Sequence, residues 1–107
     1  MNTSDATLTI SPRVGYLLTS LTETPDLDTA LRKVLADYVE MKLVQLRQQI
    51  RSFETKWGMS FSEFAERCES NALGRDPYDY EVEKDFWEWE QALTLLRHYE
   101  SLQKQWT

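Results

Sequence analysis

The longest regular pattern of apolar and polar positions lies between Pro25 and Gly58, and it predicts one long helix. No Gly or Pro interrupts this stretch. Thr24 and Pro25 have the residue types preferred at a helix N-cap and first position, and Gly58 can end the helix in a left-handed conformation. At about 1.5 Å per residue the helix would be roughly 50 Å long, so we expect it to need partners. Its apolar positions are Leu31, Leu35, Val39, Leu43, Leu46, Ile50, Phe53 and Trp57.

The two halves of this helix differ in their apolar pattern. From Leu43 to Trp57 the apolar residues alternate between spacings of three and four, which is typical of a helix that packs along one other helix. The N-terminal half carries a second apolar set, which widens its apolar arc, so we expect more neighbours to bury it. That second set is Leu27, Leu31, Val34, Tyr38 and Met41.

Shorter patterns lie on either side of the long helix. Residues 6–10 alternate small or polar side chains with apolar ones, which predicts a short strand, and Ser11-Pro12 predicts the start of a helix. Ser60 and Glu63 have the spacing of a capping box, so another helix should begin there. From Asp79 a helical pattern returns, and we expect this last helix to pack antiparallel against residues 43–57. Its apolar positions are Val82, Phe86, Trp89, Leu93 and Leu96.

The predicted fold class is therefore mainly α, with a short N-terminal strand, a long central helix and antiparallel C-terminal helices. We divide the chain into a dimerisation region, residues 1–45, and a helical partner-binding region, residues 46–107, joined through the long helix. A homodimer is expected because the N-terminal region has more apolar side chains than one short strand and helix can hide. These side chains are Leu8, Ile10, Leu17, Leu18, Leu21 and Leu31.

The order of elements over residues 6–45 resembles the ribbon-helix-helix family of small dimeric repressors and antitoxins. The matching segments are Thr7-Leu8-Thr9-Ile10, Ser11-Pro12 and the helical run of residues 27–39. In that family, one strand from each chain pairs into a ribbon that enters the DNA major groove. The resemblance implies that Thr7, Thr9 and Ser11 face the bases of operator DNA, with Arg13 beside them.

The sequence departs from that family at the positions that would contact DNA. None of Thr7, Thr9 and Ser11 is basic or carries an amide, and Asp26 and Asp28 place negative charge where the second helix would meet phosphate. Any binding to operator DNA is therefore expected to be weak and sensitive to salt.

Charge is concentrated in one segment of the C-terminal region. The net charge of the chain is −6, and residues 76–90 hold seven acids against the single base Lys84, while the rest of the chain is neutral. Aromatic side chains interleave with these acids, a composition that suits an interface for a basic protein. The predicted partner-binding residues are Tyr78, Tyr80, Glu81, Glu83, Asp85, Trp87 and Glu88.

Two structural alternatives remain open for this segment. Its acids can pair within the chain with basic residues of the long helix, namely Lys42, Arg47, Arg51 and Lys56. Trp87 can pack on the short helix of residues 61–70 instead of facing a partner.

The runs 56–61 and 85–89 are also similar to a small uncharacterised prokaryotic family associated with antitoxin-like genes.

No pattern of catalytic, metal-binding or cofactor-binding residues is present in the sequence. There is one histidine, His98, one cysteine, Cys68, and the three glycines stand far apart. No apolar run is long enough for a membrane span and no signal-peptide pattern occurs, so we expect a cytoplasmic protein without enzymatic activity. We interpret it as an antitoxin-like protein that dimerises and neutralises a basic partner. The alternative is a structural helical oligomer or adaptor with no nucleic-acid role.

Overall fold

The protein is mainly helical, as predicted. The computed structural model describes residues 9–105. Its helices are α1 (Pro12–Thr22), α2 (Leu27–Trp57), α3 (Phe61–Glu69) and α4 (Tyr80–Lys104). The chain forms two compact units, with the division between Tyr38 and Val39 inside the sequence of α2.

The N-terminal unit contains α1 and the first part of α2. Pro12 is the first residue of α1, and the backbone N–H of Val14 donates to Ser11 Oγ at 3.2 Å, so the predicted helix start is confirmed. Lys33 Nζ donates to the carbonyl oxygen of Thr22 at 3.3 Å and thereby joins the end of α1 to α2.

The N-terminal unit covers its apolar side chains poorly. Among its described residues, only Thr22 and Ala30 are buried. Leu17 is 53% exposed, Leu21 77% and Leu35 55%. Neighbours within the described chain therefore leave Leu35 of α2 exposed, and leucines of α1 are exposed as well.

The predicted strand of residues 6–10 lies mostly outside the described residues. Only Thr9 and Ile10 are described, and they precede α1 without forming a strand. Residues 9–105 contain no strand at all.

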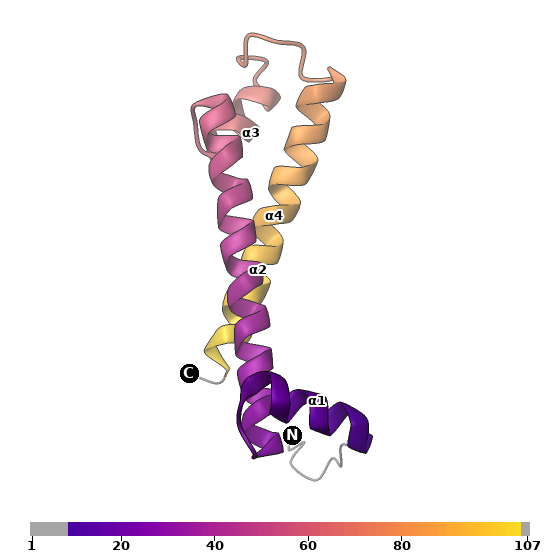
Figure 1. Cartoon of the computed structure of the whole chain (residues 1–107). Coiled ribbons are helices and arrows are strands. Elements are labelled where there is room, and N and C mark those ends of the chain that lie inside the picture. The colour runs from indigo at the N-terminus through magenta and orange to yellow at the C-terminus, as the bar shows by residue number, and fades with distance from the viewer. Residues whose placement is uncertain (1–8, 106–107) are drawn as a thin grey trace. The chain divides into compact units, whose positions relative to one another are not determined.

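The C-terminal unit is built on antiparallel packing of α2 against α4, with α3 at one end of the pair (Figure 1). Arg47 Nη2 lies 3.4 Å from Glu100 Oε2, and Gln103 Nε2 donates to Glu40 Oε1 at 3.3 Å, so later residues of α4 pair with earlier residues of α2. The predicted antiparallel arrangement is confirmed. The core joins Leu46, Ile50 and Phe53 of α2 with Phe64 of α3 and with Val82, Trp89 and Ala92 of α4.

Aromatic contacts hold α3 in place. The ring centroids of Trp57 and Phe64 are 4.9 Å apart, and those of Phe61 and Phe86 are 5.1 Å apart. Trp89 is fully buried and stacks on Phe53 with ring centroids at 5.4 Å. Large apolar areas of this kind supply most of the stabilisation of a small core.

Helix ends follow the sequence signals at two of three positions. Gly58 has φ of 69° and ends α2 in the left-handed region, where an L side chain is disfavoured. Ser60 Oγ accepts from the N–H of Glu63 at 3.3 Å, although the Glu63 carboxylate pairs with Arg67 and not with Ser60. The prediction of Thr24 as N-cap of α2 was wrong.

Asp26 caps α2 in place of Thr24. The helix begins at Leu27, and Asp26 Oδ2 accepts from the N–H of Thr29 at 3.0 Å. Hydrogen bonds from Thr29, side chain first and then backbone, lower the pKa of Asp26. A carboxylate is a better acceptor than a hydroxyl for the unpaired N–H groups at a helix start, which explains why the helix begins two residues later.

Candidate partner-binding surface

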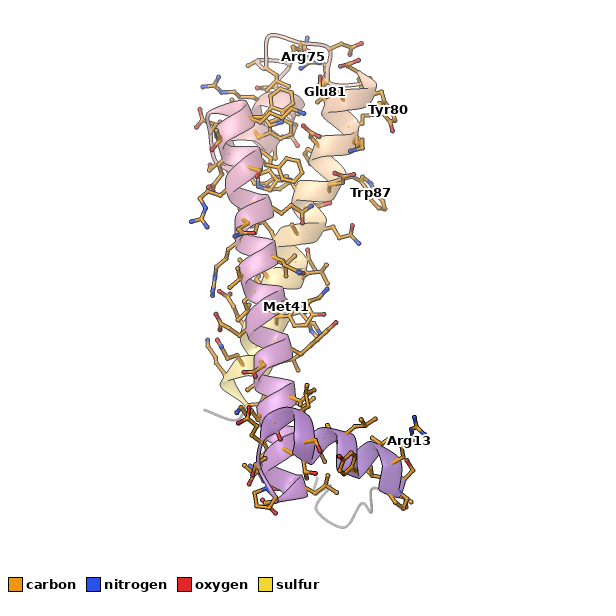
Figure 2. All side chains as sticks on the ribbon, in the orientation of Figure 1. Arg13, Met41, Arg75, Tyr80, Glu81 and Trp87 are labelled. Carbon is orange, nitrogen blue, oxygen red and sulfur yellow. The ribbon has the colours of Figure 1, made fainter. Side chains whose placement is uncertain are left out.

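All but one of the predicted partner-binding residues lie on α4, where they divide between two faces; Tyr78 precedes the helix. Glu81 and Asp85 face α2 and make ion pairs within the chain. Tyr80 and Trp87 point away from α2 (Figure 2) and are 76% and 71% exposed. Residues at i and i+7 lie on one side of a helix, so these two aromatic rings share a face.

The inward face is organised by Asp85, which is only 4% exposed. Trp57 Nε1 donates to Asp85 Oδ2 at 2.9 Å, and Lys56 Nζ lies 2.6 Å from the same oxygen. Lys56 Nζ also lies 2.8 Å from Glu81 Oε2. Lys56 and Trp57 are the last two residues of α2, so the C-terminal end of α2 contacts the first turns of α4.

Arg75 extends this ion-pair network from the loop before α4. Its Nη2 lies 2.7 Å from Asp79 Oδ2 and 2.8 Å from Glu81 Oε1, and its guanidinium lies 5.3 Å from the centroid of the Trp57 ring. Figure 2 shows Arg75 and Glu81 at the same end of the unit. Sequence analysis missed Arg75 because the acidic segment was counted from Asp76, although its spacing to Asp79 is that of an i,i+4 pair.

The network changes the proton affinity of its members. Hydrogen bonds from Lys56 and then Arg75 lower the pKa of Glu81 to about 2. Hydrogen bonds to Asp85 and then Glu81 raise the pKa of Lys56. At neutral pH Glu81 and Lys56 are therefore both charged, and their pairing serves the fold of this unit. Intramolecular pairing, one of the two alternatives raised by the sequence, accounts for Glu81 and Asp85.

The basic residues that pair with the acidic segment are only partly those expected from the sequence. Lys56 pairs with this segment as expected, but Arg47 pairs instead with Glu100. Glu88 pairs with Lys84 of its own helix at 3.0 Å. Within residues 9–105, Glu83 forms no ion pair. The acidic segment thus keeps unpaired negative charge on the side of α4 that carries Trp87.

A groove of about 650 Å³ lies between α3 and α4. Its apolar surface includes Ala65, Val82 and Phe86, and its edge carries Tyr78, Trp87 and Glu83. Tyr78 is 80% exposed, so a second accessible aromatic ring stands beside Trp87 at the edge of the groove. Trp87 borders α3 but remains exposed, which leaves the aromatic surface accessible.

Two further residues of α3 line this groove and were not predicted. Glu69 is exposed and lies four residues after Ala65, so both face the groove from the same side of α3. Cys68 is half-buried there, and burial raises the pKa of its thiol. The helical period places Glu69 on the same side of α3 as Ala65, but the sequence does not show which helix that side faces.

The predicted DNA-binding residues belong to the other unit. Thr7 lies outside the described residues, and Thr9 and Arg13 are exposed. Figure 2 shows Arg13 projecting from α1, whereas the Ser11 hydroxyl accepts the capping hydrogen bond from Val14. The position of these residues is compatible with contact to another molecule, and nothing else in the described structure indicates DNA.

Residues 9–105 contain no group of three or more His, Cys, Asp or Glu side chains placed to hold a metal ion. None of the helices in that range is sufficiently long and apolar to cross a membrane. Comparison with protein-family models, curated proteins and solved structures gives no match to this chain.

Proposed function

We propose that this chain is a non-catalytic, antitoxin-like binding protein that dimerises through its N-terminal unit and neutralises a basic protein through its C-terminal unit. The proposal assigns the partner-binding role to the outward face of α4. Glu81 and Asp85, which the sequence suggested as contact residues, act in this proposal as supports for the fold.

The outward face of α4 is the observation that carries the proposal. Tyr80, Glu83 and Trp87 follow each other at helical spacing, and both aromatic rings are more than two-thirds exposed. Exposing an indole to water gains the monomer nothing, but exposed tryptophan and tyrosine are the residues that most often dominate binding energy at interfaces. Nearby unpaired carboxylates accelerate encounter with a positively charged partner.

The exposed leucines of the N-terminal unit support self-association. Leu17, Leu21 and Leu35 are each more than half exposed, and Tyr16 is 68% exposed. Leu17 and Leu21 are four residues apart and so lie on one side of α1, and exposed apolar side chains there would be stabilised by burial against another copy. This feature also fits the alternative function, a structural oligomer without a basic partner.

Co-expression with the product of the adjacent gene tests the proposal. If that product is a small basic protein, it should co-purify with the wild-type chain and not with Trp87→Ala. Val44→Ala is the control because Val44 is also exposed, lies on α2 of the same unit and is not part of the outward face of α4. Retained capture by Trp87→Ala, or no association of the wild-type pair, would favour the structural oligomer.

A further inference from the structure

The groove between α3 and α4 has the composition of a receptor for a single cationic side chain. We propose that it receives the guanidinium of an arginine from the basic partner. This inference rests on the proposed function and names the chemistry that the partner presents. Two exposed aromatic side chains, Tyr78 and Trp87, border the groove, and two carboxylates, Glu69 and Glu83, lie along its sides.

The two carboxylates are available for an external cation. None of the ion pairs within residues 9–105 contains Glu69 or Glu83. The nearest basic residues in sequence are already engaged: Arg67 pairs with Glu63 at 2.6 Å, and Lys84 pairs with Glu88 at 3.0 Å. The groove therefore offers negative charge that the fold does not neutralise.

The floor of the groove is apolar, which strengthens such an interaction. Ala65, Val82 and Phe86 line the groove and are less exposed than Tyr78 and Trp87 at its edge, and burial raises the pKa of the Cys68 thiol beside them. An arginine side chain can lay its methylene groups on such a surface while its charged head reaches the carboxylates at the edge. Partial exclusion of water makes the charge interaction stronger than on an open surface.

The chain itself already binds an arginine in this manner at the opposite face of α4. The Arg75 guanidinium lies over the Trp57 ring at 5.3 Å and contacts the carboxylates of Asp79 and Glu81. An indole with carboxylates beside it thus holds a guanidinium within this fold. Trp87 and Glu83 repeat the combination on the outward face, where no arginine of residues 9–105 lines the groove.

Arginine fits this site better than lysine does. The guanidinium is planar and weakly hydrated, so it stacks on an aromatic face and keeps in-plane N–H donors for carboxylates. The ammonium of lysine is a compact and strongly hydrated charge, so aromatic rings and apolar surface stabilise it less than they stabilise a guanidinium.

The test uses a short peptide with one arginine and the same peptide with citrulline, which has the same shape without the charge. Each is titrated into the isotopically labelled full chain while the indole N–H signal of Trp87 is followed by NMR. The arginine peptide should shift this signal saturably, and citrulline should bind at least roughly fivefold more weakly. Equal binding of the two peptides would overturn the proposal.

Two matched variants locate the site. Glu83→Gln should weaken arginine binding by roughly fivefold, whereas Glu90→Gln, which removes the same charge from α4 outside the groove, should change it less than about twofold. Equal losses in both variants would show a general charge effect and contradict the groove.

The outcome for the groove is separable from that for the proposed function. If the arginine peptide binds but Trp87→Ala still captures the basic protein, the affinity of the groove for a guanidinium stands, but the proposed function and the partner as source of the arginine fail. If capture depends on Trp87 while the arginine peptide does not bind, the proposed function stands and the arginine assignment fails.

Discussion

Trp57 Nε1 donates a hydrogen bond to Asp85 Oδ2 at 2.9 Å and so joins the last turn of α2 to the second turn of α4. Asp85 is almost fully buried, and an ionised carboxylate is tolerated there only with partners. Trp57 supplies one of them and Lys56 supplies the other. The acidic residue at position 85 therefore belongs to the architecture of the C-terminal unit.

Replacement of Trp57 by Phe should destabilise the protein by about 1 to 3 kcal/mol. The aromatic contact with Phe64 is largely kept, but a buried carboxylate loses a donor. Urea unfolding followed by circular dichroism measures the change. Trp87→Phe is the control, and it should shift the free energy of unfolding by less than about 0.5 kcal/mol because Trp87 is exposed. Equal effects of the two variants would contradict the role assigned to Trp57.

The contribution of Glu81 to stability should disappear in acid. Its pKa is about 2 in the folded chain and near 4.5 without its partners, so the unfolded chain binds the proton more tightly. The stabilisation is therefore fully present above pH 4.5 and is lost as the pH falls toward 2. The melting temperatures of wild type and Glu81→Gln should differ at pH 6 and converge near pH 2. A constant difference across this range would show that Glu81 is not held by Lys56 and Arg75.

Sedimentation at micromolar concentration should give about twice the chain mass of 12.7 kDa. Leu21→Glu should produce the monomer with unchanged helical content, because Leu21 is the most exposed leucine of α1 and makes little contact within the chain. Leu95→Glu is the control, since Leu95 lies on α4 of the other unit and is partly exposed. A wild-type monomer, or a dimer that survives Leu21→Glu, would contradict dimerisation through this face.

Operator DNA, if bound, should be bound weakly. Thr7, Thr9, Ser11 and Arg13 include a single basic residue, Arg13, and hydrogen bonds from Thr29 lower the pKa of Asp26 at the start of α2. Few neutralised phosphates mean little affinity. An electrophoretic shift with the upstream promoter fragment should occur only at low salt and should be abolished by Arg13→Ala, but not by Arg97→Ala. A shift that persists at about 200 mM salt would contradict this expectation.

The sequence pattern predicted the helix packing of the C-terminal unit better than it predicted which residues of that unit face outward. The alternating spacing from Leu43 to Trp57 and the stripe from Val82 to Leu96 specify two amphipathic faces, and the antiparallel pair follows because those faces must cover each other. The N-terminal unit was harder, since its exposed leucines have no cover within the described chain. Local pattern does not reveal whether a second molecule provides it.

The division of the acidic segment was not predictable from composition. Glu81 and Glu83 are two residues apart in the same run, yet one pairs with Lys56 and the other faces the groove. Their roles differ because positions two apart lie on different sides of a helix, and the side that meets α2 depends on the tertiary register. The variants Glu83→Gln and Trp87→Ala therefore test binding, whereas Glu81→Gln tests the stability of the fold.

The affinity of the purified chain for the purified product of the adjacent gene tests the central claim most directly. Titration calorimetry should detect a complex, and Trp87→Ala should weaken it by about 30-fold or more, equivalent to about 2 kcal/mol for an interface hot spot. Its helical content and melting temperature should match those of wild type because Trp87 is 71% exposed. An unchanged affinity in a folded Trp87→Ala variant, or the absence of any complex with the wild type, would contradict the account.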